Sequence, residues 1–163
     1  SAKDIPITFE QLPAKAQAFV KQYFKIEEIA SVWRDDDIHD QDYKVYFNDG
    51  SEIEFYANGD WEEVKTRTLA VPEKLIPNGI AQYVKKTYPQ TDIYKIQKKR
   101  YGYEIELANG LDLEFNAKGE FNSFVKDITL ISFSFAYLAI ATVSLVSPDL
   151  DNVIRIELLE RDL

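Results

Sequence analysis

The chain has 163 residues, of which 45% are hydrophobic and 29% are charged, and its formal net charge at pH 7 is −9. These fractions are typical of a globular protein with one ordinary core or two small ones, and they argue against disorder. The negative charge argues against nucleic acid as a partner, and the absence of cysteine excludes disulfides, thiolate metal sites and a cysteine nucleophile.

One phrase of the sequence occurs twice. A shift of 60 residues places Gly50 on Gly110 and Gly59 on Gly119, with the surrounding alternating pattern preserved. A repeat of this length is one compact unit that has been duplicated. We therefore expect three segments: a first repeat, a second repeat and an atypical apolar C-terminal extension (residues 1–68, 69–127 and 128–163).

Each copy begins with a helical pattern and continues with strand-like alternation. Leu12, Ala16 and Val20 recur at helical spacing beside Pro13, which suits a first helical turn, and the pattern returns over residues 76–88. The predicted strands are 28–34, 43–47, 51–56 and 60–65 in the first copy and 92–99, 102–107, 111–116 and 120–126 in the second. The prediction is an α+β fold of two tandem units, each a helix covering a four-stranded antiparallel meander, with two sheets forming an extended surface.

The repeated glycines are predicted to lie at positive φ in three-residue hairpin loops. A two-residue turn would pair Phe47 with Glu52 and set an apolar side chain against a polar one. A three-residue loop that ends in a left-handed Gly50 instead pairs Val45 with Ile53. The same construction is expected at Gly59, Gly110 and Gly119, and it keeps Phe55, Trp61, Phe115 and Phe121 on the helix-covered face.

The candidate binding site lies on the opposite face of the first sheet. Trp33, Tyr46 and Tyr56 have outward parity, with Glu52 and Glu54 beside them. Tryptophan and tyrosine are common anchors of protein interfaces, and the glutamates would complement a basic partner. Alternatively, these aromatics stabilise cross-strand pairs or lie beneath the C-terminal extension. The same parity places further residues outward: Lys44, Val64, Gln97, Glu104, Glu106, Asp112, Glu114, Asn116 and Phe124.

The segment DDDIHDQD (residues 35–42) holds five aspartates and the only histidine, His39. Carboxylates suit calcium, but no glycine occupies the sixth position counted from Asp35, and Tyr46 rather than glutamate is the twelfth. His39 lacks other nitrogen or sulfur donors. We therefore expect a solvated acidic loop that binds no cation tightly, and we assign no metal ligand and no cofactor.

No catalytic residue is predicted. His39 lies on an apparently mobile loop, and Glu52 and Glu54 share an open strand face rather than a pocket that would raise one pKa. The basic run KIQKKRYGY (residues 95–103) reads as a solvated strand and turn in which only Lys95 and Lys99 point together. Its alternative role is to hold an acidic partner or a lipid headgroup.

Residues 128–146 are nineteen uncharged residues, five of which are serine or threonine. The length approaches that of a membrane span. The alternation of residues 132–137 favours strands instead. Strand-like packing, a membrane tether and a non-native extension therefore remain the alternatives.

The segments YKVYFNDGSEIEFYANGDWEEV and YGYEIELANGLDLEFNAKGEFNSF, within tandem helix-and-meander units, resemble the PepSY-like family of exported bacterial proteins. That family is also described as similar to beta-lactamase inhibitory protein, and the resemblance covers about residues 5–127. It implies a periplasmic or secreted protein of a Bacteroides-type cell, with its export signal removed, and a binding or inhibitory role without catalytic residues. The expected function is capture of a protein or peptide in the cell envelope. The alternatives are a small-ligand or cation carrier and a structural component of an envelope assembly.

Overall fold

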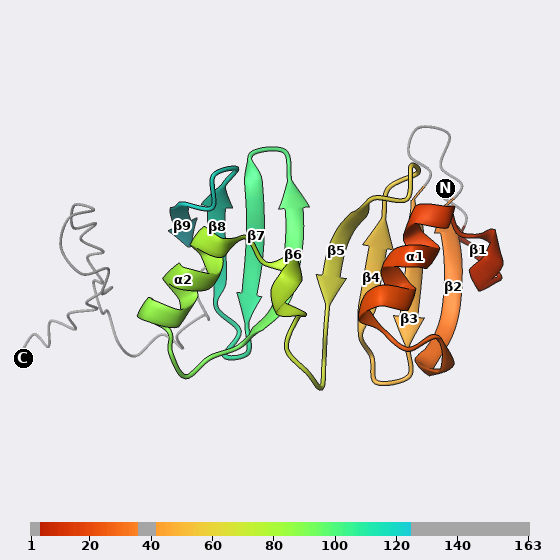
Figure 1. Ribbon diagram of the computed structural model, residues 1–163, viewed down its shortest axis with the longest axis horizontal. Helices are drawn as coiled ribbons and strands as arrows, with labels where there is room; N and C mark the ends of the chain where they lie inside the picture. Colours follow the sequence, from red (N-terminus) through yellow and green to blue (C-terminus); the bar gives the residue numbers. More distant parts are fainter. Residues whose placement is uncertain (1–3, 36–41, 125–163) are drawn as a thin grey trace, which may run out of the picture. The chain divides into compact units, whose positions relative to one another are not determined.

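The computed structural model describes residues 4–35 and 42–124, which form an α+β fold (Figure 1). The α-helices are α1 (Ala14–Tyr23) and α2 (Asn78–Thr87), and short 3-10 helices occur at η1 (Phe9–Gln11), η2 (Ile26–Glu28) and η3 (Glu73–Leu75). The strands are β1 (Asp4–Ile7), β2 (Ile29–Asp35), β3 (Tyr43–Phe47), β4 (Glu52–Phe55), β5 (Trp61–Lys65), β6 (Ile93–Lys99), β7 (Gly102–Leu107), β8 (Asp112–Asn116) and β9 (Phe121–Phe124).

The nine strands belong to one antiparallel sheet in which each strand pairs with the next along the chain. β5 pairs with β6, and Val64 lies opposite Ile96 at the centre of this pairing. The expectation of two separate sheets is therefore wrong. Each meander would otherwise end in an exposed strand edge at β5 or β6, and pairing satisfies the backbone groups of both edges.

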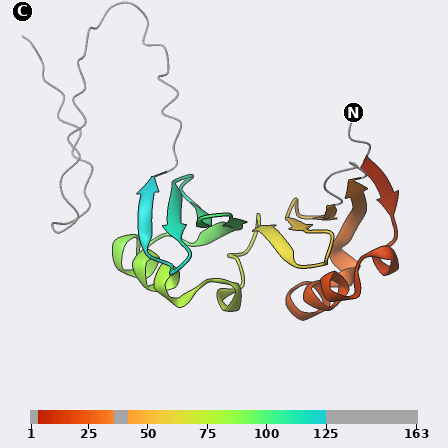
Figure 2. The same cartoon turned by 90° about the horizontal axis from the view of Figure 1, so that it is seen from above.

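The helix-covered face of this sheet is a continuous apolar row. Consecutive pairings join residues that are each at most 5% exposed: Val32, Val45, Ile53, Val64, Ile96, Ile105 and Leu113. α1 and α2 lie on the same side of the sheet (Figure 2), and each buries two apolar residues there: Ala16 and Val20 from α1, Ile80 and Val84 from α2. The core is therefore shared along the whole sheet.

Both helices start and stop where local sequence dictates. Pro13 and Pro77 occupy the N-cap positions, where a missing backbone N–H is harmless. α1 ends where Phe24 turns extended, and α2 ends at Thr87, two residues before Pro89. The helical spacing predicted from the sequence is thus confirmed in both places.

The hairpin loops have the predicted construction. Gly50 has φ +87°, and Val45 lies opposite Ile53, as a three-residue loop requires. The other three glycines of the repeat also have positive φ, with values of +82°, +80° and +77° at Gly59, Gly110 and Gly119. The positive φ of these glycines and the register that they set are both confirmed.

A β-bulge in β5 changes which residues face outward. Glu63 lies opposite Glu54, whereas Trp61 lies opposite Phe55, so Glu62 is an additional residue that reverses the parity. Val64 is consequently buried, and its predicted outward position is wrong. A matching shift occurs in β9, where the backbone of Phe124 pairs with that of Leu113. The side chain of Phe124 lies outside the described part of the structure, so its outward placement stays a prediction.

β1 was not predicted from the sequence. It is an edge strand that pairs with β2, and Pro6 lies opposite Trp33. A proline is tolerated at a sheet edge, where its missing N–H interrupts no central ladder. Within the described residues, no helix is long and apolar enough to cross a membrane. Most of the acidic segment (residues 36–41) and the C-terminal extension lie outside the described part of the chain.

Candidate functional site

The sheet face that the helices leave uncovered, here called the outer face, carries the five residues predicted as a binding site. Val45 and Phe47 of β3 and Ile53 and Phe55 of β4 are buried on the helix side, so the intervening residues point outward. The outward set is half-buried, lies outside the apolar core, and consists of Trp33, Tyr46, Glu52, Glu54 and Tyr56.

An ion pair lies among the three aromatic side chains. Lys44 Nζ is 2.8 Å from Glu54 Oε1, and the hydrogen bond to Glu54 raises the pKa of Lys44. Trp33 lies directly across from Lys44, while Tyr46 follows Lys44 and Tyr56 follows Glu54 at the next outward position along each strand. We call these residues together with Glu52 the outer patch: Trp33, Lys44, Tyr46, Glu52, Glu54 and Tyr56.

The polar atom of the tryptophan is satisfied within the sheet. Trp33 Nε1–H donates to Ser31 Oγ at 2.9 Å, which joins two outward positions of the same strand. This hydrogen bond restrains the indole ring against β2. The patch therefore presents a positioned aromatic surface without a buried unsatisfied donor at Trp33.

β5 adds two carboxylates that the sequence reasoning missed. Burial raises the pKa of Glu62, and the negative charges of Asp42, Glu54 and Glu63 raise it further. Burial also raises the pKa of Tyr56, with Glu62 as the largest electrostatic contributor. The Tyr56 N–H donates to the Asp60 carbonyl at 2.9 Å, so Tyr56 and Glu62 lie at the same corner of the outer patch. The sequence signal for these two carboxylates is the spacing in WEEVK. Trp61 and Val64 are three residues apart, so both can face the core only if the strand contains a bulge.

A second cluster of charged side chains spans the pairing of β5 with β6. Lys95 Nζ is 2.9 Å from Glu104 Oε1 and 3.8 Å from Glu63 Oε2, while Lys99 Nζ is 3.6 Å from Glu104 Oε2. We call these four residues the seam cluster. Burial alone would raise the pKa of Glu104, but the hydrogen bond and charge of Lys95 hold it below the ordinary value. Burial raises the pKa of Glu63, and the charge of Lys95, which is 3.8 Å away, only partly offsets this shift.

The basic run of residues 95–103 is divided between the two sheet faces. Lys95 and Lys99 point outward together, as predicted, and both engage Glu104. Lys98 points to the helix side, where its Nζ lies 3.9 Å from the centre of the Trp61 ring. Burial lowers the pKa of Lys98. These three lysines therefore have partners within the fold.

Replacing Lys95 with methionine is expected to lower the free energy of unfolding by about 1.5–3 kcal/mol at pH 7, because the buried Glu63 and the half-buried Glu104 both lose their closest cation. The difference from the parent protein should shrink as pH falls below about 4.5, the ordinary value for glutamate. The reason is that a carboxyl group with a depressed folded-state pKa stabilises the fold only above that range.

Urea titrations at pH 7 and pH 4 measure this effect. Lys99→Met is the matched control, with an expected loss below about 1 kcal/mol, because its Nζ is more exposed and farther from Glu104. Equal losses for the two variants would show that the seam cluster is not organised around Lys95.

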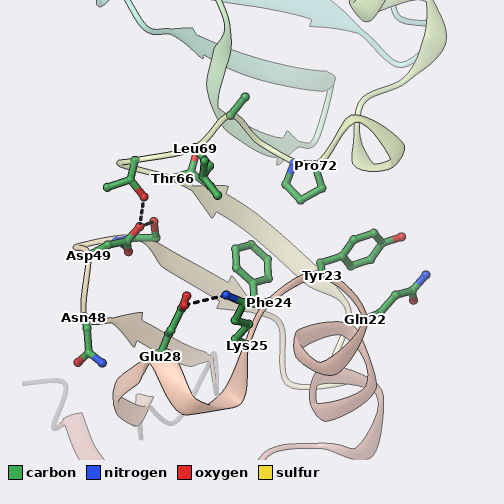
Figure 3. A pocket seen from close by; sticks show the side chains of 13 residues that line it. Gln22, Tyr23, Phe24, Lys25, Glu28, Asn48, Asp49, Thr66, Leu69 and Pro72 are labelled. Carbon is green, nitrogen blue, oxygen red and sulfur yellow. Dashed lines mark hydrogen bonds and ion pairs between the residues drawn. The ribbon is translucent and has the colours of Figure 1, made fainter.

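A cavity of about 830 Å³ lies on the helix side between the end of α1, the β3–β4 turn and the segment after β5. Figure 3 shows Tyr23 and Phe24 contributed by the end of α1, while Leu69 and Pro72 come from the segment that joins β5 to α2. Leu69 is 76% exposed at this cavity. The volume is that of an ordinary small-molecule pocket.

Polar groups around this cavity are largely bonded to one another. Asp49 accepts from the Ser51 N–H and hydroxyl at 2.8 and 3.0 Å and from the Thr68 hydroxyl at 2.7 Å. Burial opposes ionisation of Asp49, but these donors hold its pKa below the ordinary value. Lys25 pairs with Glu28 at 3.3 Å (Figure 3). Asp49 therefore connects the β3–β4 turn to the segment after β5.

The described residues contain no group of three or more histidine, aspartate or glutamate side chains arranged to hold a metal ion. Within the acidic segment, Asp35 N–H donates to the Asp42 carbonyl at 2.8 Å, which closes the base of the loop. His39 and the remaining aspartates lie outside the described residues. The expectation that this loop binds no cation tightly stays a prediction.

Three solved structures from Bacteroides are similar to this chain. A DUF2874-family protein of Bacteroides vulgatus, provisionally described as periplasmic, is 33% identical with a TM-score of 0.71, over 76% of this chain and 98% of that protein. A Bacteroides thetaiotaomicron protein, provisionally described as calcium-regulated and periplasmic, is 34% identical with a TM-score of 0.72, over 76% and 97%. Another Bacteroides vulgatus protein, provisionally described as periplasmic and of unknown function, is 30% identical with a TM-score of 0.71, over 76% and 100%.

Comparison with curated proteins finds no match. A profile of the beta-lactamase-inhibitor-like, PepSY-like proteins matches residues 41–123, which is half of the chain. The matched region begins just before β3 and ends in β9, so it contains most of the sheet and all of α2. The expectation drawn from the repeated segments is confirmed: this chain belongs to the PepSY-like, beta-lactamase-inhibitor-like family.

Proposed function

We propose that this protein is an exported, non-enzymatic binding module that holds a protein or peptide on the outer face of β2–β5. The observation that carries the proposal is the outer patch, where Trp33, Tyr46 and Tyr56 surround one ion pair on the face without helices. The outer face of an antiparallel sheet is ordinarily polar. Half-buried aromatic residues there have the chemistry of interface anchors.

The exported location is supported by the relatives, which are provisionally described as periplasmic proteins. The chain covers nearly all of each of these relatives, so the likeness extends through their whole fold. We infer that this protein also acts in the periplasm or outside the cell.

A non-enzymatic role is supported by the state of the carboxylates. A general acid needs a raised pKa in a site that excludes water. Glu104 has a lowered pKa, and Glu54 accepts from Lys44. Glu62 and Glu63 have raised pKa values, but they lie on the uncovered sheet face. Positioned charge for recognition fits these residues better than acid–base chemistry.

We also infer that the fold arose from two tandem copies of one helix and four strands. The order α1, β2, β3, β4, β5 is followed by α2, β6, β7, β8, β9. Equivalent pairings recur: Phe55 with Trp61 in the first copy and Phe115 with Phe121 in the second. The aromatics of the outer patch occur only in the first copy, which directs the proposed contact to that half of the sheet.

The double variant Tyr46→Ala with Tyr56→Ala is expected to abolish partner capture, since each buried aromatic anchor contributes about 2–4 kcal/mol to binding. Its free energy of unfolding should change little, because neither side chain belongs to the apolar core. Capture from a Bacteroides periplasmic extract, quantified by mass spectrometry, measures the first quantity, and urea denaturation measures the second.

The double variant Tyr94→Ala with Tyr101→Ala makes the same chemical change outside the outer patch and should retain capture. Retained capture by Tyr46→Ala with Tyr56→Ala would contradict the proposal. The cavity lined by Phe24 and Leu69 would then become the better candidate, and its volume of about 830 Å³ would favour a small-ligand carrier. The role in an envelope assembly depends on residues 128–163 and stays a prediction.

A further inference from the structure

Two adjacent carboxylates at the border of the outer patch lack a close cation. Glu63 is only 9% exposed, yet its nearest cation, Lys95 Nζ, lies 3.8 Å away and is closer to Glu104 at 2.9 Å. Among the described residues, no hydrogen bond or ion pair engages the side chain of Glu62. Burying a carboxylate without a close partner is unfavourable, so both glutamates gain from a cation supplied by another molecule.

The surroundings of Glu62 have an excess of negative charge. The negative charges of Asp42 before β3, Glu54 on β4 and the adjacent Glu63 on β5 all raise the pKa of Glu62. Lys44 on β3 engages Glu54 at 2.8 Å. The charge of Lys99 on β6 lowers the pKa of Glu62, but its Nζ is paired with Glu104 at 3.6 Å. The charge of this corner is thus complementary to a basic group.

An aromatic side chain lies beside the same carboxylates. The Tyr56 N–H donates to the Asp60 carbonyl at 2.9 Å, so Tyr56 lies beside the start of β5, where Glu62 follows two residues later. After burial, the charge of Glu62 is the next cause of the raised pKa of Tyr56. A guanidinium group combines planar donors that fit carboxylate oxygens with a face that stacks on aromatic rings. An ammonium group lacks the second feature. The combination of carboxylates and an aromatic ring therefore favours arginine over lysine.

Resting on the proposed function, we propose that the partner inserts an arginine side chain at the β4–β5 corner of the outer face. Its guanidinium donates to Glu62 and Glu63, and the face of the same guanidinium stacks on the ring of Tyr56. Lys44 and Glu54 border the site on the side of Trp33 and Tyr46, so the arginine extends the aromatic contact. The partner is a polypeptide with an exposed arginine in its contact surface.

This arrangement couples binding to pH. Burial raises the pKa of both Glu62 and Glu63. The charges of Asp42, Glu54 and Glu63 reinforce the shift at Glu62, and those of Glu54 and Glu52 reinforce it at Glu63. Lys99 opposes the shift at Glu62, and Lys95 and Lys65 oppose it at Glu63. A guanidinium favours the ionised carboxylates, so binding releases protons, and affinity falls as pH drops through the raised pKa values.

The test titrates the full ¹⁵N-labelled chain with a capped peptide of about nine residues that contains arginine. A second peptide replaces arginine with citrulline, which is nearly isosteric and uncharged. Glu62→Gln with Glu63→Gln is expected to weaken binding of the arginine peptide roughly tenfold or more at pH 7.5. Glu106→Gln with Asp112→Asn removes the same charge from a paired position on the outer face of β7 and β8, and should weaken binding less than about twofold.

Three outcomes would overturn the inference. They are equal weakening by the two double variants, equally strong binding of the citrulline and arginine peptides, and no binding of the arginine peptide. Calcium chloride alone shifting the resonances of Glu62 and Glu63 would also overturn it, because it would identify a cation site. Periplasmic capture separates the two proposals. Capture that survives Glu62→Gln with Glu63→Gln but is lost with Tyr46→Ala and Tyr56→Ala refutes the arginine site alone. Capture that survives the tyrosine variant refutes the proposed function.

Discussion

Replacing Phe55 with alanine is expected to lower the free energy of unfolding by about 3–5 kcal/mol. Phe55 is completely buried, and its ring contacts that of Phe19 edge-on at 5.6 Å between ring centres. It lies between Tyr43 and Trp61 in the sheet. Truncation therefore leaves a cavity at the contact of α1 with β3, β4 and β5, which the surrounding backbone pairing prevents from closing.

Urea denaturation followed by circular dichroism measures this loss. Phe55→Leu is the conservative control and should cost less, because it retains most of the buried volume. Trp61→Ala should also destabilise the fold, but by less than Phe55→Ala, since Trp61 is only partly buried between Phe19 and Lys98. A loss below about 1 kcal/mol for Phe55→Ala would contradict the assignment of this residue to the core.

The same variant tests whether the two halves of the sheet unfold together. Val64 and Ile96 are both fully buried and lie opposite each other where β5 meets β6. Because the apolar row is continuous there, we expect one cooperative transition for the parent protein and for Phe55→Ala. Two transitions, one of them insensitive to Phe55→Ala, would show that the halves are independent units.

Local structure could be predicted because its determinants are local. The predicted strand 43–47 coincides with β3, and 102–107 coincides with β7, since alternation and loop glycines define both ends. The hairpin at Gly50 was predictable in register, because only a three-residue loop keeps Val45 and Ile53 on one face. In such elements the physical cause lies within a few residues of its effect.

The join between the halves was not predictable by the same reasoning. Lys65 lies opposite Lys95, and no hairpin loop connects these positions to signal their register. The pairing depends instead on two strand edges that meet after the intervening helix has folded back. β1 escaped prediction for a similar reason, because Pro6 is tolerated only through its edge position beside β2.

The candidate site was partly accessible from the sequence. Strand parity alone placed Trp33, Tyr46 and Tyr56 on the outer face. The pairing of β3 with β4 has no bulge, and the irregularity between β2 and β3 lies before Trp33. Glu63 was missed, because its outward position follows from the bulge at Glu62 and its burial depends on Lys95 in β6. The cavity near Phe24 needs three separate segments, so no single stretch of sequence indicates it.

Gly102→Ala is expected to be severely destabilising, at about 3 kcal/mol or more. The backbone of Gly102 has φ +154°, and an added Cβ would lie 2.1 Å from the Phe115 carbonyl oxygen and 2.4 Å from the Asn116 carbonyl carbon. Both contacts are with backbone of the paired strand β8, so no side-chain rotation relieves them. Backbone strain of about 1–3 kcal/mol adds to overpacking of about 1–3 kcal/mol.

Gly110→Ala measures the backbone strain without the overpacking. Gly110 also has positive φ, at +80°, but a Cβ there meets no atom within 4 Å. Its expected cost is about 1–2 kcal/mol, from the left-handed backbone alone. The difference between the two variants in urea denaturation therefore measures how closely β7 and β8 approach at Gly102.

Since that approach sets the pairing of Tyr103 with Phe115, Gly102→Ala should also reduce hydrogen-exchange protection in β7 and β8 more than in β3 and β4. Equal costs for the two alanines would mean that β8 can move away from Gly102 without penalty, and the close approach would then have no structural role.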